Sequence, residues 1–127
     1  MANLTVNALL PFVPAKDYAT SRRFYRALGF TETFSDEGLT GFRLEGARFF
    51  LQNFYKEDLA DNFMLSLMVE DVESWWQHVA AQNLPEGFPG VKVKAPEDYP
   101  WGLREIHLID PAGVLWHIAV PAKAATP

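Results

Sequence analysis

The stretch Tyr99 to Val120 reads Tyr-Pro-Trp-Gly-Leu-Arg-Glu-Ile-His-Leu-Ile-Asp-Pro-Ala-Gly-Val-Leu-Trp-His-Ile-Ala-Val and decides the fold at one end of the chain. Its segment Asp110 to Gly113 is typical of a type I turn, because Asp is favoured at the first position, Pro presets the angle φ at the second and Gly is favoured at the last. Short runs of branched apolar residues flank the turn. The stretch therefore predicts a β-hairpin.

The composition indicates one globular domain. The chain has 127 residues, of which 49% are hydrophobic and 21% are charged, and these are ordinary values for a folded domain. It contains no cysteine, which excludes disulfides and thiol nucleophiles. The formal net charge of -5 disfavours binding to nucleic acid. No apolar run is long enough to span a membrane and no secretion signal is visible, so we expect no membrane partner and a cytoplasmic location.

The first half of the chain predicts a strand, a helix and three further strands. Leu4 to Phe12 is mostly apolar and predicts a strand that ends near Val13. Asp17 is placed to cap the helix, and Gly29 is placed to end it. Apolar residues recur at helical spacing between them. The three short strands that follow are predicted at Phe30 to Ser35, Leu39 to Leu44 and Ala47 to Asn53.

The second half repeats this order. The charged segment Tyr55 to Asn62 predicts a surface connection between the halves. Phe63 to Val69 then predicts a strand, and Asp71 caps a second amphipathic helix that ends near Asn83. The remainder is predicted as a loop at Leu84 to Gly90, a strand at Val91 to Ala95, a loop at Pro96 to Gly102 and the two strands of the hairpin.

The two halves together predict an α+β fold. Counting from Asp17 and Asp71, the helix positions one and eight residues further on are apolar in both halves, which supports an internal repeat. We therefore expect a single domain over residues 1–127, made of two βαβββ modules at about residues 4–54 and 63–121.

Four motifs in a set order carry a resemblance to a known family. They are Asp-x-x-x-Ser-x-x-Phe-Tyr-x-x-Leu-Gly-Phe at residues 17–30, Val-Glu-Asp-Val at 69–72, Pro-Trp-Gly-x-Arg at 100–104 and Asp-Pro-x-Gly at 110–113. In this order they resemble the vicinal oxygen chelate superfamily, which contains glyoxalase I, extradiol dioxygenases, fosfomycin resistance enzymes and bleomycin resistance proteins. The resemblance implies two βαβββ modules that form a curved mixed sheet around a cavity, and a homodimer.

In this superfamily one residue from each of four strands holds a divalent metal. Most of the matching positions in this sequence are apolar, and Leu, Met and Phe offer no hard donor atom. We therefore expect no metal and no other cofactor. The matching positions are Leu9 or Leu10, Phe50 or Gln52, Met64 or Leu65, and His117.

Because most of the metal ligands are missing, the sequence resembles the bleomycin resistance branch of the superfamily more than its metal-dependent enzymes. Those proteins bind a flat cationic drug between two subunits without altering it. Aromatic faces suit such ligands, so Trp101 and Phe34 are the candidates for stacking. The expected function is sequestration of a planar or cationic small molecule by a homodimer. The full set of candidate ligand-binding residues is Trp101, Phe34, His117, Arg104, Phe50, Gln52 and Met64.

Two other functions remain open from the sequence. One is an enzyme of the same superfamily that uses His117, Gln52 or His107 for an unusual metal site or for acid/base catalysis. The other is a structural or regulatory dimer whose cavity its own side chains fill. Whether the two histidines face each other depends on the hairpin register, because a simple two-residue turn sets Ile106 opposite His117 and a bulge reverses this.

Overall fold

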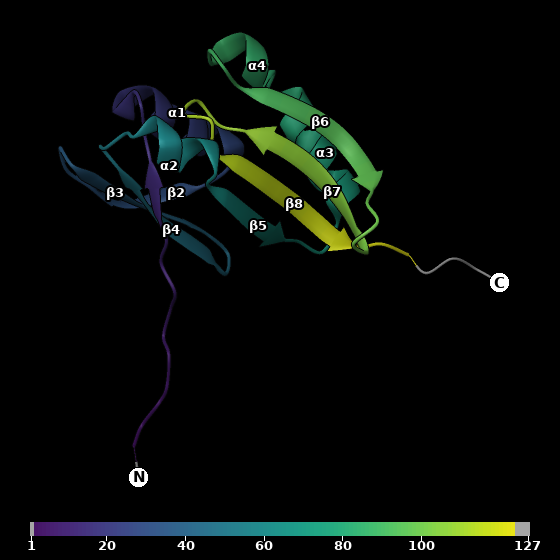
Figure 1. Ribbon diagram of the computed structural model, residues 1–127, viewed down its shortest axis with the longest axis horizontal. Coiled ribbons are helices and arrows are strands. Elements are labelled where there is room, and N and C mark those ends of the chain that lie inside the picture. Colours follow the sequence, from purple (N-terminus) through teal and green to yellow (C-terminus); the bar gives the residue numbers. More distant parts are fainter. Residues whose placement is uncertain (1, 124–127) are drawn as a thin grey trace.

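Two four-stranded sheets lie side by side in the computed structural model, which describes residues 2–123 (Figure 1). The first sheet and its helix comprise β1 (Phe12–Pro14), α1 (Tyr18–Leu28), β2 (Thr31–Ser35), β3 (Leu39–Leu44) and β4 (Ala47–Gln52). A short helix, α2 (Glu57–Asp61), leads to β5 (Met64–Met68), α3 (Val72–Ala81), α4 (Leu84–Gly87), β6 (Lys92–Asp98), β7 (Leu103–Ile109) and β8 (Leu115–Pro121).

The two sheets have the same topology. Their strand orders are β1-β4-β3-β2 and β5-β8-β7-β6, so the first strand of each set pairs with the last. That pairing is parallel in both sheets, and the other pairings are antiparallel. The α+β fold predicted from the sequence is confirmed.

The two long helices begin at the predicted caps. The Asp17 side chain accepts a hydrogen bond from the backbone N–H of Thr20, and the Asp71 side chain accepts from Ser74 in the same way. Such bonds satisfy N–H groups that the first helical turn leaves free. Gly29 ends α1 with φ of 123°, a backbone angle that favours glycine.

The predicted first strand is wrong over most of its length. Only Phe12–Pro14 forms a strand, and it pairs with β4 over three residues. The segment before it extends away from the two sheets (Figure 1), and Leu4 and Leu9 are 85% and 88% exposed. Its apolar, β-branched sequence suits a strand, but a strand needs a neighbour to take its hydrogen bonds, and residues 4–10 pair with no other strand among the described residues.

Three segments predicted as loops contain regular structure. The connection Tyr55 to Asn62 holds α2, and the loop Leu84 to Gly90 holds α4. Strand β6 continues to Asp98, through the predicted break at Pro96. A shift in register between Lys94 and Glu97 explains this continuation, since a bulge on an edge strand accommodates a proline that cannot donate a backbone hydrogen bond.

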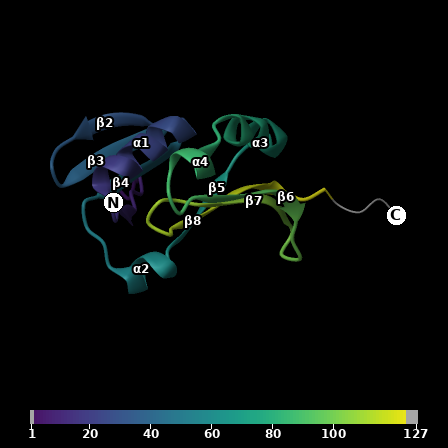
Figure 2. The same ribbon diagram turned by 90° about the horizontal axis from the view of Figure 1, so that it is seen from above.

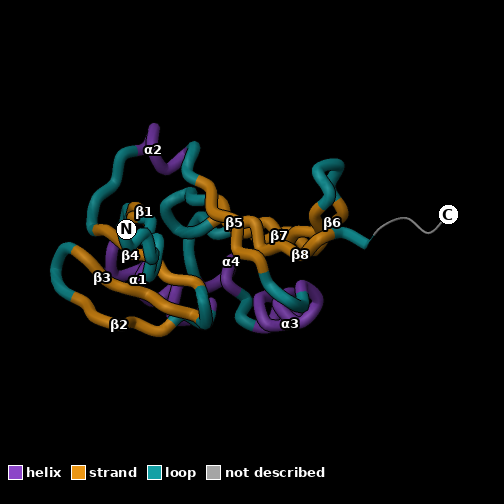
Figure 3. Tube along the Cα trace, turned by 90° about the horizontal axis from the view of Figure 1, so that it is seen from below, coloured by secondary structure: helices purple, strands orange, loops and turns teal. Residues whose placement is uncertain are grey.

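Helices cover one face of the sheets and leave the other face open. In Figure 2, α3 and α4 lie on one side of the second sheet, and its other side carries no helix except α2 near one end. The tube in Figure 3 shows the same layers from below. The covered face holds one core that both sheets share, and its members include Phe24, Tyr25, Phe42, Phe49, Leu51, Leu108 and Trp116. Within residues 2–123, the helices are too short or too polar to cross a membrane.

Candidate functional site

The β7–β8 hairpin brings two histidines together on the open face of the second sheet. His107 pairs directly with His117, and their ring centroids are 4.7 Å apart. The loop explains this register. The Gly113 N–H donates to the Asp110 carbonyl across the turn, and Gly113 then takes φ of 97° before the strands resume. The loop therefore has one residue more than a simple two-residue turn, and this residue moves His107 into the place expected for Ile106.

Glu105 joins the two histidines. One of its carboxylate oxygens, Oε1, lies 3.0 Å from Nε2 of His107 and 3.0 Å from Nδ1 of His117. Only 3% of the Glu105 side chain is exposed. Burial raises the pKa of this carboxyl group, but hydrogen bonds from His107, His117 and Trp101, with the charge interaction with His117, together hold the pKa below its usual value. The site therefore contains an ionised, nearly buried carboxylate between two imidazoles.

An aromatic stack extends from this cluster to the surface. The Tyr99 ring stacks on His107 with centroids 4.7 Å apart, and Trp101 stacks on Tyr99 at 4.6 Å. Trp101 lies in the loop between β6 and β7 and is 57% exposed. The stack therefore presents a bare indole face to solvent and connects it to the Glu105 cluster.

The open face of the first sheet is aromatic instead. Phe50 lies 5.1 Å from Phe12 and 5.8 Å from Phe34, measured between ring centroids. Gly41 makes room for this group, since a Cβ atom there would meet the Phe34 ring at 2.6 Å. Gln52 is two residues from Phe50 on the same strand, so both side chains lie on this face.

The residues at the metal positions of the superfamily do not fit a metal. In β5 it is Met64, 62% exposed, that lies on the open face, while Leu65 packs against the core. Leu10 precedes β1, and β4 offers only Phe50 and the amide of Gln52. With His117 this set contains one imidazole and no carboxylate, too few donors for a hard divalent ion.

Arg104 lies away from this open face. Its guanidinium donates to Glu73 of α3 at 2.9 Å and to Asp98 of β6 at 3.2 Å. It therefore joins a helix to the sheet.

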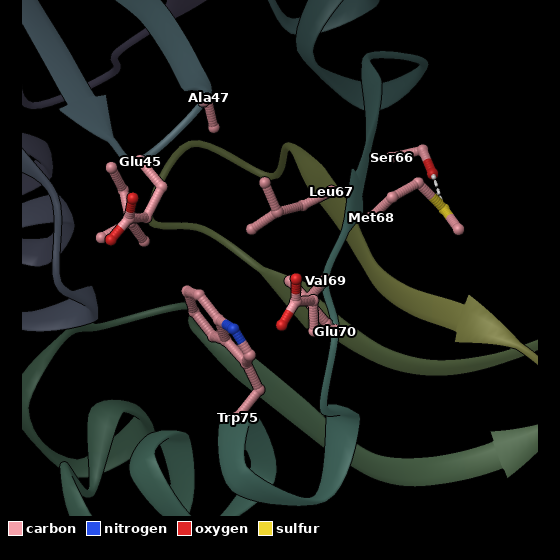
Figure 4. Close-up of a pocket in the computed structure, with 10 residues that line it drawn as sticks. Glu45, Ala47, Ser66, Leu67, Met68, Val69, Glu70 and Trp75 are labelled. Carbon is pink, nitrogen blue, oxygen red and sulfur yellow. Dashed lines mark hydrogen bonds between the residues drawn. The ribbon is translucent and has the colours of Figure 1, made fainter.

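A hollow of about 870 Å³ lies between the two sheets, beside the free edge of β5. Figure 4 shows Leu67 and Trp75 pointing into it, with Glu45 and Ala47 on the opposite wall. None of the predicted ligand-binding residues lines this hollow. Those residues instead divide between the open faces of the two sheets, with Arg104 outside both groups.

Sequence reasoning missed the importance of Glu105 and Tyr99. Alternation along a strand places Glu105 and His107 on the same face, so that part was visible in the sequence. The addition of His117 depended on the extra loop residue. The stacking of Tyr99 depended on how the loop between β6 and β7 folds back over β7.

The equal strand orders of the two sheets, with polar and aromatic groups on their open faces, define an α+β protein built of two similar halves. Residues 6–118 match the model of the Glyoxalase/Bleomycin resistance protein/Dioxygenase superfamily. The chain belongs to this superfamily.

Proteins similar to this chain include bleomycin resistance and bleomycin-binding proteins. The chain is 30% identical over 111 residues to a bleomycin resistance protein of Klebsiella pneumoniae, a match that covers 83% of this chain and 85% of that protein. The crystal structure of a bleomycin resistance determinant encoded on the transposon Tn5 superimposes with a TM-score of 0.79 at 23% identity, covering 91% of this chain and 98% of the other. A bleomycin-binding protein complexed with bleomycin gives a TM-score of 0.76 at 23% identity, covering 94% and 100%. These structures show the same fold.

Proposed function

We propose that the protein sequesters a small planar or cationic molecule of the bleomycin type, without changing it covalently. The exposed stack of Trp101 on Tyr99 carries this proposal, because a bare indole face held in place by a second ring is suited to stack on a flat ligand. The ionised Glu105 beneath the stack favours a cation. The similarity to the Klebsiella pneumoniae bleomycin resistance protein supports the same ligand class.

We propose that two copies of the chain form the complete binding site. Phe12 and Phe34 are 52% and 45% exposed on the first sheet, and Met64 is 62% exposed on the second. Apolar side chains grouped in this way favour burial against a partner. The N-terminal segment supports the dimer as well, since Leu4 and Leu9 are exposed and pair with no strand within residues 2–123.

Quenching of tryptophan fluorescence by metal-free bleomycin tests ligand binding. We expect saturable binding, and we expect Trp101→Leu to weaken it about tenfold, since one stacking contact contributes roughly 0.5 to 2 kcal/mol. Phe88→Leu is the matched control, because Phe88 packs against Phe24 on the covered side of the molecule. Calorimetry of the Trp101→Leu variant provides the affinity where its fluorescence signal is lost. Equal affinities for the wild type and Trp101→Leu would contradict the proposed site.

Mass spectrometry of the recovered ligand tests sequestration against catalysis. We expect bleomycin to leave the complex with unchanged mass, and a product of altered mass would overturn the binding-only proposal. Sedimentation equilibrium tests the dimer in the same sample. A mass of two chains is expected, while a monomer in the presence of saturating ligand would contradict a site shared between copies.

A further inference from the structure

We propose that Glu105, His107 and His117 bind a divalent transition-metal ion such as Zn²⁺ or Cu²⁺ at a site of their own. Among the described residues, these three bring their ligand atoms within 4.8 Å of one another. Only His117 coincides with a metal position implied by the superfamily. The other two residues lie on β7, a strand that contributes no ligand to that set, so the site is built differently. The proposal departs from the absence of a metal expected from the sequence.

The spacing of the donor atoms suits a small ion. Zinc binds imidazole nitrogen and carboxylate oxygen at about 2.0 to 2.2 Å, so donors at the corners of a tetrahedron lie about 3.3 Å apart. The two edges that share Oε1 of Glu105 are already 3.0 Å long. The remaining edge joins the two imidazole nitrogens and is at most 4.8 Å long. Small rotations of the two imidazole rings would shorten this distance to the value that a tetrahedral site requires.

The chemistry of the three donors favours a borderline transition metal. Imidazole nitrogen suits zinc, copper and nickel, whereas calcium and magnesium require oxygen ligands. A set of two histidines and one glutamate also occurs in zinc enzymes that leave a fourth position open for water or substrate. Here the open position would face the bare side of the second sheet, opposite the side that α3 covers.

The surroundings restrict how the ligands can move. Tyr99 stacks on the His107 ring, and its hydroxyl lies 3.4 Å from Nδ1, the nitrogen that faces away from Glu105. An outer partner of this kind orients a metal-binding histidine. Because Glu105 is nearly buried, its carboxylate has little water to compete with the ion. The site is therefore partly preformed.

Calorimetric titration of the full chain with Zn²⁺ alone, after removal of metals by a chelator, tests the proposal. We expect one ion per chain, and a loss of at least about 100-fold in affinity for both Glu105→Gln and His117→Leu, since even removal of an outer partner of a metal ligand costs 10- to 100-fold. His78→Gln is the matched control, because His78 lies on α3 and its Nε2 contacts the Leu28 carbonyl oxygen outside the cluster. Its affinity should equal that of the wild type.

Two outcomes would overturn the metal site. One is the absence of Zn²⁺ or Cu²⁺ binding to wild-type protein whose circular dichroism shows a folded chain. The other is binding that persists unchanged in both folded variants. If Glu105→Gln fails to fold, His107→Gln replaces it, since His107 is partly exposed and its loss leaves a smaller defect. Bleomycin is absent from this titration, so its result is independent of whether the proposed drug binding holds.

Discussion

The hairpins β3–β4 and β7–β8 occupy corresponding places in the two sheets, yet they turn differently. The first closes with two residues, Glu45 and Gly46, between the pair Leu44 and Ala47. The second closes with three residues after Asp110, and the last of them, Gly113, has a positive φ. One extra residue decides which side chains face each other across a hairpin. The two sheets can therefore share one topology and still carry chemically different side chains on their open faces.

The second hairpin is also tied to the other module. The buried Asp110 side chain accepts hydrogen bonds from the backbone N–H groups of Ala112 and Val114 and from the hydroxyl of Tyr25 in α1. The same hydroxyl accepts a hydrogen bond from the indole of Trp116 at 2.9 Å. The Glu45–Gly46 turn instead borders the hollow in Figure 4. The turn at Asp110 is therefore held by local hydrogen bonds and, in addition, by a tertiary contact with α1.

The largest expected effect on stability comes from ionisation of Asp110, a buried carboxyl group that only the second hairpin contains. Burial raises the pKa of this carboxyl group to about 6, and the bonds from Tyr25 and the backbone offset this only in part. The folded state therefore holds the Asp110 proton more tightly than the unfolded state, and stability falls as pH rises from about 4 to about 6. Relative to Asp110→Asn, we expect the wild type to lose up to about 3 kcal/mol of unfolding free energy over this range.

Urea denaturation of both proteins at several pH values measures this change. Asp71→Asn is the contrasting control, because hydrogen bonds from Ser74 lower the pKa of the exposed Asp71. The stabilisation that Asp71 contributes is fully present above its unfolded-state pKa and is lost as the pH falls through its lower folded-state pKa. A constant difference between the wild type and Asp110→Asn across the range would contradict the burial effect.

Removal of the Tyr25 hydroxyl should have the next largest effect. Tyr25→Phe removes one of the donors to the Asp110 carboxylate and leaves the buried indole N–H of Trp116 without its acceptor, and we expect a loss of about 2 kcal/mol in unfolding free energy. Because the variant removes a donor to the carboxylate, the pH dependence assigned to Asp110 should also move to higher pH. Tyr18→Phe in the same helix is the control, since the hydroxyl of Tyr18 bonds to Thr40 at a less buried place. Equal losses of unfolding free energy in Tyr25→Phe and Tyr18→Phe would contradict a particular contribution of the Tyr25–Asp110 hydrogen bond to stability.

The smallest effects should come from the backbone of the two turns. Glu45 has φ of 51°, so Glu45→Gly should relieve strain and stabilise the chain by about 0.5 kcal/mol. Gly113→Ala should destabilise it by about 1 kcal/mol. Space is not the cause, because a Cβ atom at Gly113 would come no nearer than 3.9 Å to Asp61. Thermal denaturation of the Glu45→Gly and Gly113→Ala variants measures whether each change stabilises or destabilises the chain. A stabilising Gly113→Ala would contradict the assigned turn.

Local patterns explain why much of the fold was predictable. Asp17 and Gly29 mark the ends of α1 through hydrogen bonds to neighbouring residues, and such bonds depend on sequence alone. The prediction of a long N-terminal strand was wrong because Leu4 and Leu9 satisfy a strand pattern but have no partner strand in the described part of the chain. The β-propensity of a segment shows only that its residues suit a strand. Whether the strand forms depends on a second segment that pairs with it.

The candidate site divides in the same way. The sequence by itself determined the type of each side chain, the capped helices, the repeat and the turn at Asp110, because these depend on neighbours within a few residues. It also indicated that the metal ligands of the superfamily are missing. Only the tertiary structure decided that His117 faces His107 across Glu105, and that Tyr99 and Trp101 stack over them. These contacts depend on hairpin register and loop packing, which one additional residue at Gly113 is enough to shift.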